Sequence, residues 1–441
     1  MAKVIVIGGG LAGLSAAAAL GSTGFSVDVF EARGFLGGRA TSYPVAASGD
    51  DSELIDNCQH VLLRCCVNLL DFYSRLGVAD KIRFYREYYF LEPGGRVSIL
   101  KRGRLPAPLH LTESFLRMKC FDASDKLAIT RGMLALMRER RHRQDLENIT
   151  MLDWLREKRQ TPRAIERFWR QVLVSAVNEE LDRMAAAHAF QVFWLGMLAG
   201  VNNYEMGIPD VPLRDLYSSE AWRRTENVRI HVRSPVDRIA IADGAAYGVQ
   251  VASVMEQADY YVCSVPFDRI ATVAPDMRLD TAAFEHSPIT GIHVWFDKPV
   301  TELPHAALLD RNIQWMFNKS EGRYLQFVVS ASRKMIEMSR PEVIALALRE
   351  AAEFFPKIQK AKVERATVIK DLRATFSARP GMEIARPQAS TRLGNVFLAG
   401  DWTKTGWPAT MEGAVRSGYL AAEAVSIAAG RPQRFLLADL G

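Results

Sequence analysis

The sequence lacks an uninterrupted apolar stretch of the roughly 20 residues that a transmembrane helix needs. Its most apolar stretch near the N-terminus, residues 4–20, is interrupted by Gly8, Gly9 and Gly10 and preceded only by Lys3. A strand followed by a turn therefore explains this stretch better than a signal peptide does. We expect no membrane-spanning helix.

Cysteine is scarce, with five residues, Cys58, Cys65, Cys66, Cys120 and Cys263, among 441. They form no CxxC pair and have no accompanying histidine spacing, so neither a metal site nor a disulfide framework is expected. Their irregular spacing suits a reducing cytoplasm. The net charge of +6 favours anionic partners of several kinds. No recognised nucleic-acid-binding module accompanies that charge, so we expect no nucleic-acid partner.

Apolar periodicity divides the chain into helices and strands, with nucleotide-binding elements at both ends and in the middle. The length suggests two lobes rather than one core. Helices are predicted over residues 11–20, 54–76, 127–141, 149–158, 162–177, 183–198, 341–355 and 412–429, and strands over 3–7, 26–31, 228–232, 236–241, 247–252, 258–265, 291–296, 314–318, 324–330 and 395–399.

A dinucleotide fingerprint follows the first predicted strand, where residues 8–13 match G-x-G-x-x-G. Gly8 permits the tight turn, Gly10 lets a diphosphate approach the backbone, and Gly13 lets the helix pack on the strand. The helix N-terminus at Leu11 and Ala12 offers N–H groups to the diphosphate. Strand, turn and helix together predict a dinucleotide site rather than a simple glycine-rich turn.

The residues after the second predicted strand indicate which dinucleotide binds. Glu31 lies where an acidic residue binds the adenosine ribose hydroxyls. With Ala32, Arg33, Gly38 and Arg39 it forms a segment that resembles the E-x-R-x-x-x-G-G-R motif of the flavin amine oxidase and carotenoid desaturase superfamily. This resemblance implies FAD, with Arg33 and Arg39 along the diphosphate and ribityl chain and Gly38 giving backbone access.

The C-terminal part resembles the closing motifs of the same superfamily. Gly400 and Asp401 match its Gly-Asp pair, and Asp401 can accept hydrogen bonds from the ribityl chain. A helix that begins near Thr410 and Met411 would direct N–H groups toward the flavin edge where charge accumulates on reduction. The same resemblance implies that Val236, in the middle of the chain, lies on the strand whose backbone meets the adenine.

These motifs together predict an α/β fold in which a Rossmann-like FAD-binding lobe is interleaved with a substrate lobe of helices and antiparallel sheet. No second G-x-G-x-x-G is present, so an NAD(P)H domain is not expected and an external reductant must supply electrons. The expected FAD lobe comprises residues 1–86, 210–285 and 385–430; the substrate lobe comprises residues 87–209 and 286–384; and residues 431–441 form a tail.

Three internal segments narrow the resemblance. The closing G-D-W-T-K-T-G-W-P looks more like phytoene desaturases than amine oxidases. Residues 56–63 (DNCQHVLL), 293–300 (HVWFDKPV) and 314–318 (QWMFN) resemble the squalene-associated FAD-dependent desaturases, understood as hydroxysqualene dehydroxylases of hopanoid biosynthesis. The resemblance spans nearly the whole chain and is weakest over residues 87–224. Cys58 departs from the glycine expected there.

The resemblance implies reductive removal of the allylic hydroxyl of hydroxysqualene to give squalene. Reduced FAD would deliver hydride from N5 to an allylic carbon as hydroxide leaves, which requires protonation of the oxygen or stabilisation of a cation. His60 is the nearest candidate acid, with Asp56 as an orienting residue, and Gln59 and His60 lie in the loop expected beside the flavin. The alternative is that Asp56 and His60 hold this loop through backbone hydrogen bonds.

A thirty-carbon substrate predicts a tunnel and a membrane location. His293 and Trp295 lie two apart on a predicted strand, so they share a face that we expect, with Trp407, to line the tunnel. For Trp295 the alternative is core packing. Residues 105–137 are rich in Leu, Phe and Met and precede the largely basic cluster 138–143, which is typical of a peripheral segment at the inner face of the membrane. An ordinary lobe helix with a basic end is the alternative.

Two other functions fit the same motifs. The first is another oxidoreductase on this scaffold, either a carotenoid desaturase of the phytoene type or an amine oxidase. An amine oxidase would need an aromatic cage at the flavin, for which Trp402 and Trp407 are the candidates. The second is a non-catalytic prenyl-binding protein, because prenyl-protein escort proteins share this fold.

Overall fold

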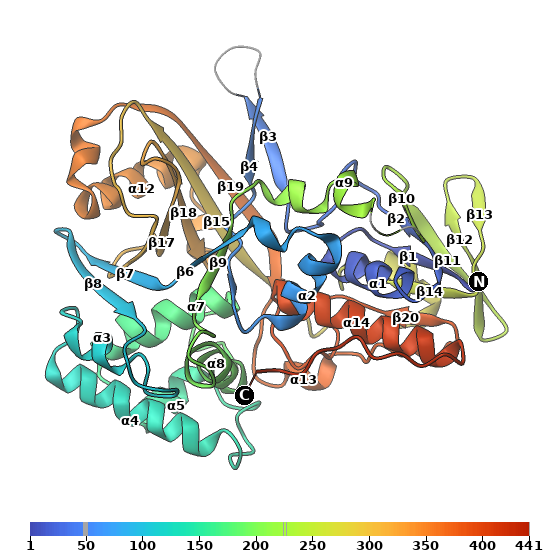
Figure 1. Ribbon diagram of the computed structural model, residues 1–441, viewed down its shortest axis with the longest axis horizontal. Coiled ribbons are helices and arrows are strands. Elements are labelled where there is room, and N and C mark those ends of the chain that lie inside the picture. Colours follow the sequence, from blue (N-terminus) through green and yellow to red (C-terminus); the bar gives the residue numbers. More distant parts are fainter. Residues whose placement is uncertain (47–51, 224, 226, 441) are drawn as a thin grey trace.

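A five-stranded parallel sheet forms one side of the molecule, in the order β10-β2-β1-β14-β20 (Figure 1). The computed structural model describes residues 1–46, 52–223, 225 and 227–440. Both ends and the middle of the chain contribute strands to this sheet. Its strands are β1 (Lys3–Ile7), β2 (Ser26–Phe30), β10 (Val228–His231), β14 (Tyr260–Cys263) and β20 (Val396–Leu398).

Helices α1 (Leu11–Gly21) and α14 (Met411–Ala428) cover one face of this sheet. Every residue of α1 is buried, because the sheet lies on one side of the helix and α14 on the other. The two helices approach closely at Gly418, where a Cβ would lie 2.2 Å from the carbonyl oxygen of Ala12. The opposite face of the sheet packs on the antiparallel strands β11 (Val236–Ala242), β12 (Ala245–Val251) and β13 (Val254–Glu256).

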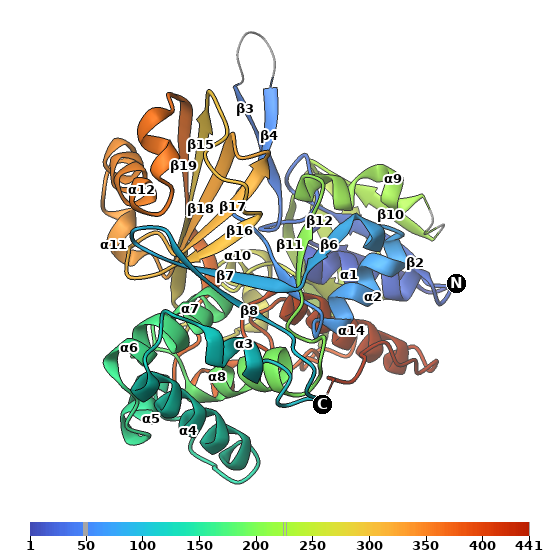
Figure 2. The same ribbon diagram turned by 60° about the vertical axis from the view of Figure 1, so that its left-hand side comes forward.

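A seven-stranded mixed sheet forms the other side, in the order β19-β15-β18-β17-β16-β7-β8 (Figure 2). All neighbouring strands are antiparallel except β16 and β7. Helix α12 (Arg340–Phe354) packs on one face through Val343 and Ala347. The strands are β7 (Glu87–Glu92), β8 (Arg96–Lys101), β15 (His286–Phe296), β16 (His305–Leu308), β17 (Trp315–Ser320), β18 (Tyr324–Ser330) and β19 (Val363–Phe376).

Helices gather below the mixed sheet and form the third part of the molecule (Figures 1 and 2). Helix α4 begins with a capping box in which Asp122 and Asp125 exchange hydrogen bonds with each other's backbone. Its partners pack around the buried Trp154 and Trp169. The helices are α3 (Thr112–Arg117), α4 (Ala123–Glu139), α5 (Met151–Glu157), α6 (Pro162–Ala164), a π-helical turn (Ile165–Arg170), α7 (Gln171–Val177), α8 (Ala186–Phe193) and a second π-helical turn (Trp194–Leu198).

Shorter elements join these three parts. The two-stranded β3–β4 hairpin projects from the molecule beside the mixed sheet (Figure 1). The remaining elements are α2 (Val67–Leu76), β3 (Ser42–Ala46), β4 (Ser52–Asp56), β5 (Leu62–Leu63), β6 (Ile82–Tyr85), β9 (Met206–Pro209), α9 (Ser219–Trp222), α10 (Ile270–Val273), α11 (Arg333–Ile336), α13 (Met382–Ala385) and the 3₁₀ turns Ala79–Lys81, Leu213–Tyr217, Pro275–Met277 and Pro356–Lys360.

The predicted fold class is confirmed: a parallel Rossmann-like sheet is combined with a mixed sheet and helices. One predicted element is wrong in its first half, because residues 54–76 do not form one helix. Ile55 belongs to β4 and lies opposite Tyr43 of β3, so pairing within the hairpin satisfies its backbone. The helix begins only at Val67. Among the described helices, none is long and apolar enough to cross a membrane.

Candidate cofactor site and adjoining cavity

The glycine-rich turn between β1 and α1 leaves the first turn of the helix open. Gly10 caps α1 without a side-chain hydrogen bond. Among described atoms, a Cβ at Gly10 would meet within 4 Å only the Cα of Gly38, at an ordinary 3.8 Å. Packing within the protein therefore does not require glycine at position 10, whereas a phosphate approaching the N–H groups of Leu11 and Ala12 does. The turn thus fits the diphosphate of FAD.

The other two glycines of the fingerprint serve the fold itself. Gly8 has a φ of +106°, a backbone conformation that favours glycine. A Cβ at Gly13 would lie 2.0 Å from the carbonyl oxygen of Gly8 and 2.5 Å from the Oγ of Ser264. Gly13 therefore lets α1 approach the strands, as the sequence predicts, while Gly10 leaves room for a ligand.

Glu31 lies directly beside this turn, at the end of β2. Its side chain is 8% exposed and accepts hydrogen bonds from the backbone N–H groups of Gly9, at 2.7 Å, and Arg33, at 2.8 Å. Ser234, two residues before Val236, donates its N–H to the carbonyl oxygen of Glu31 at 2.9 Å. The structure therefore brings the predicted ribose-binding carboxylate, its neighbour Ala32 and the β11 segment together. The remaining lone pairs of the carboxylate suit ribose hydroxyls.

An ion pair joins the N-terminal and C-terminal motifs. The Nη2 of Arg39 lies 2.6 Å from the Oδ1 of Asp401, which follows Gly400, and Nη1 of Arg39 donates to the carbonyl oxygen of Ala374. Burial lowers the pKa of the Arg39 guanidinium, but Asp401 outweighs this effect and the pKa is raised. Arg33 donates to the carbonyl oxygen of Gly38 at 3.3 Å. Both arginines thus lie at the second glycine turn.

Helix α14 begins at the border of the cofactor site. Thr410 caps it by accepting a hydrogen bond from the N–H of Gly413 at 3.0 Å. Glu412 points toward α2, where its carboxylate accepts hydrogen bonds from the backbone of Asn68 and Leu69. Burial raises the pKa of Glu412. These contacts fix the start of the helix. The backbone N–H groups of its first turn, at Met411, are therefore held beside an apolar cavity.

The loop after β4 holds Asp56 and His60 apart. Asp56 accepts hydrogen bonds from the Oγ of Ser42, the N–H of Leu213 and the Nζ of Lys319. His60 instead places Nδ1 3.0 Å from the carbonyl oxygen of Cys58. Among the described residues no hydrogen bond joins the two predicted catalytic side chains. These contacts match the loop-holding alternative for Asp56.

The protonation of His60 follows from this contact. A carbonyl oxygen only accepts, so Nδ1 must carry the hydrogen and donate it to Cys58. Burial lowers the pKa of His60, which favours the neutral ring. A neutral ring protonated at Nδ1 presents a lone pair at Nε2, so it can accept a proton but cannot supply one. Burial likewise raises the pKa of Cys58 to about 12, so its thiol stays protonated.

An apolar cavity of about 230 Å³ opens between the cofactor-side segments and the mixed sheet with its neighbouring helices. Gln59, Thr410 and Met411, all predicted to lie at the flavin, line one wall. Trp407 lines the same cavity, and its Nε1 donates to Asp439 at 3.2 Å. The opposite walls come from β15, β17 and β18 of the mixed sheet and from α7 and α8.

His293 and Trp295 share a strand face, but neither is among the residues that line this cavity. Trp295 stacks on Tyr324 with ring centroids 4.3 Å apart, and Arg365 lies over its other face. His293 is fully buried, with Nδ1 2.7 Å from the hydroxyl of Tyr324. The packing alternative for Trp295 is therefore the one its contacts support. Trp402 also packs in the core, against Phe284, and does not line the cavity.

A parallel nucleotide-binding sheet with an open helix N-terminus, joined to a mixed sheet above an apolar cavity, defines a flavoprotein of the amine oxidase type. The chain belongs to the family of flavin-containing amine oxidoreductases, whose sequence profile matches residues 11–426. It is therefore a flavin-dependent oxidoreductase, and its cofactor is FAD.

Relatives and solved structures agree with this assignment. The chain is 24% identical to the zeta-carotene desaturase of Synechocystis sp., over 99% of this chain and 100% of the relative. It is 23% identical to the 15-cis-phytoene desaturase of Synechococcus elongatus, over 96% of this chain and 95% of the relative. An oxidoreductase from Methanosarcina mazei has the same fold, with a TM-score of 0.71 at 18% identity, covering 94% of this chain and 98% of the other. Cyclohexylamine oxidase from Brevibacterium oxydans also has this fold, with a TM-score of 0.67 at 17% sequence identity. The match covers 98% of this chain and 100% of the oxidase.

Proposed function

We propose that this protein reductively removes the allylic hydroxyl of hydroxysqualene to give squalene. The observation that carries the proposal is the apolar cavity that borders the cofactor-side residues Gln59, Thr410 and Met411. Its other walls include Val192 of α8, Leu195 of the second π-helical turn and apolar side chains of the mixed sheet. Such a lining suits a long hydrocarbon and offers poor solvation to an ammonium group. The segments that resemble hydroxysqualene dehydroxylases add the particular substrate.

FAD, when bound and reduced by an external donor, supplies the hydride for this reaction. One carbon–oxygen bond would break and one carbon–hydrogen bond would form, and the second hydrogen of the fully reduced cofactor would leave as the proton that converts the departing hydroxide to water. The protein's part is to hold the allylic carbon at the cofactor-side end of the cavity and to exclude water. His60 remains a proposed catalytic residue, although it is not among the residues that line the cavity; its neutral ring, protonated at Nδ1, can accept a hydrogen bond at Nε2 but does not supply the proton for the leaving oxygen.

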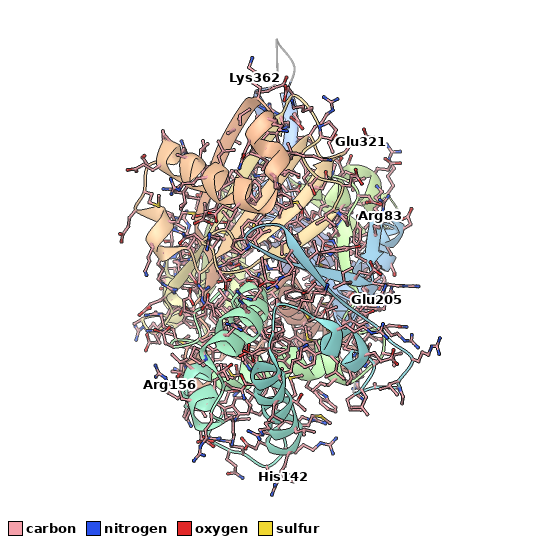
Figure 3. The ribbon with its side chains drawn as sticks, turned by 90° about the vertical axis from the view of Figure 1, so that its left-hand side faces the viewer. Arg83, His142, Arg156, Glu205, Glu321 and Lys362 are labelled. Atoms are coloured by element: carbon pink, nitrogen blue, oxygen red, sulfur yellow. The ribbon has the colours of Figure 1, made fainter. Side chains whose placement is uncertain are left out.

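The helical part supports a peripheral location at the inner face of the membrane. Leu127 and Leu134, seven residues apart on α4, are 51% and 59% exposed. Arg131 and Arg138 are exposed on the same helix. Together these side chains form an apolar and basic surface that suits anionic lipid. In Figure 3, His142 marks the free end of this helical part, at the opposite end of the molecule from Lys362.

The test uses the FAD-loaded protein after anaerobic reduction by dithionite. Hydroxysqualene is added, and products are separated by chromatography while flavin reoxidation is followed by its absorbance. We expect about one squalene for each flavin reoxidised. If no squalene forms while the flavin remains competent for reoxidation by a quinone, the proposed substrate is wrong.

Carotenoid desaturation is the second candidate, because several relatives are named as zeta-carotene or phytoene desaturases at 23–26% identity. It runs in the opposite redox sense, since desaturation removes hydrogen from the substrate and reduces the flavin. Incubating the oxidised protein with phytoene and a quinone acceptor separates the two reactions. New conjugated double bonds, seen as visible absorbance of the extracted lipid, would favour this candidate.

A further inference from the structure

One row of the mixed sheet carries buried polar side chains next to the apolar cavity. Gln326 of β18 lies directly opposite His293 of β15 on one side and Phe317 of β17 on the other. Both Gln326 and His293 are 0% exposed. Among the described residues, neither polar atom of the Gln326 amide has a hydrogen-bond partner, and the Nε2 of His293 has none either. Three buried polar atoms are thus left without a protein partner.

The same row faces the cavity. Val328 and Ser330 line the cavity, and side chains two residues apart on a strand share a face, so Gln326 belongs to that face. Phe317, opposite Gln326, also lines the cavity. Gln326 therefore lies one row, about 7 Å, along the strand from Val328. Gln326 and His293 do not themselves line the cavity; both are fully buried one row beyond Val328, next to the cavity-lining Phe317.

On β15, His293 lies beside the loop that follows β4 on the cofactor side. Gly291 has no side chain, and a Cβ at this position would lie 3.0 Å from the carbonyl oxygen of Asn57, 3.8 Å from the Cα of Cys58 and 3.6 Å from the Nε2 of His293. The free nitrogen of His293 thus points to the side of the sheet where the loop after β4 crosses. That loop carries Cys58 and Gln59 into the cavity wall.

The chemistry of the pair selects a neutral ligand that both donates and accepts hydrogen bonds. The Gln326 amide offers two N–H groups and one oxygen. Burial lowers the pKa of His293 to about 3, so its ring is neutral near pH 7 and favours neither an anion nor a cation by charge. A buried amide left unpaired is costly, and an alcohol in the cavity would satisfy it.

We propose that Gln326, together with His293, binds the hydroxyl of the isoprenoid alcohol and so makes the cavity prefer the hydroxylated substrate over its hydrocarbon product. This inference rests on the proposed function and adds the residues that recognise the polar group. The hydroxyl would be held beside the cofactor-side loop while the hydrocarbon chain fills the apolar part of the cavity. Loss of the hydroxyl removes these hydrogen bonds and favours release of the product.

The matched control is Gln314, a second buried glutamine next to the same sheet whose amide is satisfied. Its Oε1 accepts from the N–H of Ser330 at 2.9 Å, and its Nε2 donates to the carbonyl oxygen of the same residue at 3.2 Å. Gln314→Leu breaks hydrogen bonds within the protein. Gln326→Leu removes an amide that has no partner within the described protein, so it should not lower the melting temperature.

The experiment titrates the oxidised, FAD-loaded full chain with hydroxysqualene and with squalene in detergent, using the change in flavin absorbance. For the unmodified protein we expect hydroxysqualene to bind at least about tenfold more tightly than squalene. In Gln326→Leu, and in the longer Gln326→Met, this ratio should fall close to one while squalene affinity is retained. Gln314→Leu should lower the melting temperature and keep the ratio.

A preserved ratio in both Gln326 variants would overturn the inference, as would equal affinity of the unmodified protein for the two ligands. In either case the proposed function stands if reduced enzyme still forms squalene. Failure of the unmodified protein to bind either ligand would instead overturn the proposed function, and this inference with it.

Discussion

The cofactor site and the cavity are built in different ways. The cofactor site is formed by backbone groups and by residues close in sequence, such as Gly10 and Gly38, or by one long-range ion pair, Arg39 with Asp401. The cavity is formed by side chains from many separate elements, with few polar atoms. Substitutions in the cofactor site should therefore alter FAD binding or the stability of the fold. Substitutions in the cavity should alter substrate handling and leave FAD bound.

The largest effect is expected for Gly13→Ala. The added Cβ would lie 2.0 Å from the carbonyl oxygen of Gly8, which is backbone and cannot move without shifting β1 or α1. We expect the free energy of unfolding of the FAD-free protein to fall by about 3 kcal/mol or more, with loss of bound FAD. Chemical denaturation of the cofactor-free chain measures this.

Gly10→Ala is the matched comparison, because its Cβ would meet only Gly38 at 3.8 Å among described atoms within 4 Å. Its φ of −80° suits alanine. The cofactor-free protein should unfold as the unmodified chain does, while its affinity for FAD falls by about tenfold or more. Unchanged FAD affinity in Gly10→Ala would contradict the role of this position in diphosphate binding.

Filling the cavity should have the next largest effect. Ala176 of α7 lines it, so Ala176→Phe would occupy space intended for the hydrocarbon chain. We expect kcat/KM for hydroxysqualene to fall by roughly tenfold to a hundredfold, with FAD content unchanged. Activity and flavin content are measured on the same preparation. If FAD is lost instead, the two regions are not separable in the way described.

Mild acid should weaken the mixed sheet and its neighbouring helices before the parallel sheet. Burial lowers the pKa of His188, His293 and His305 to about 3, 3 and 4 from 6.5. Between pH 6.5 and 4 the unfolded chain therefore takes up protons that the folded chain does not. The free energy of unfolding should fall as the pH drops through this window, by up to about 1.4 kcal/mol per pH unit for each histidine.

His305→Gln checks this prediction, because it removes one of the histidines whose pKa burial lowers and keeps a donor for the carbonyl oxygen of Glu87. The pH dependence of unfolding should become shallower by the contribution of one histidine, up to about 1.4 kcal/mol per pH unit. Hydrogen exchange at pH 5 should rise first in β15–β18 rather than in β1 and β2. An unchanged slope would assign the acid sensitivity to other groups.

The smallest effect is expected at the exposed face of α4. Leu127→Gln combined with Leu134→Gln should reduce partitioning onto anionic lipid vesicles by about tenfold, since both side chains are more than half exposed. Turnover in detergent should be unaffected. Vesicle sedimentation measures the partitioning, and Leu136→Gln is unsuitable as a control because that side chain is buried. If the variant and the unmodified protein partition equally onto the vesicles, this face of α4 does not contact the membrane.

The same contrast explains what the sequence could predict. The glycine turn, Glu31 and the start of α14 were predictable because each depends on a short motif whose backbone geometry is local. The predicted helix over residues 54–76 failed because pairing of Ile55 with Tyr43 of β3 overrides the local pattern. The 14-residue strand β19 was missed because charged residues such as Lys370 and Asp371 interrupt its alternation. The domain boundaries stay a prediction.

Side-chain orientation was the least predictable feature. His293 and Trp295 share a face as expected, yet the cavity is lined further along the strand, at Ile289. Gln326 carries no sequence motif, and its unpaired amide becomes visible only when the register of β15, β17 and β18 is known. Likewise, the separation of Asp56 from His60 depends on Lys319, a residue more than 250 positions away.

The central claim is that the apolar cavity adjoins bound FAD, and one titration tests it directly. Squalene is added to the oxidised, FAD-loaded protein and to its Ala176→Phe variant while the flavin absorbance is recorded. A saturable change in the flavin spectrum that is lost or greatly weakened in the variant is the predicted result. A flavin spectrum that stays unchanged while radiolabelled squalene binds to the protein would contradict the claim.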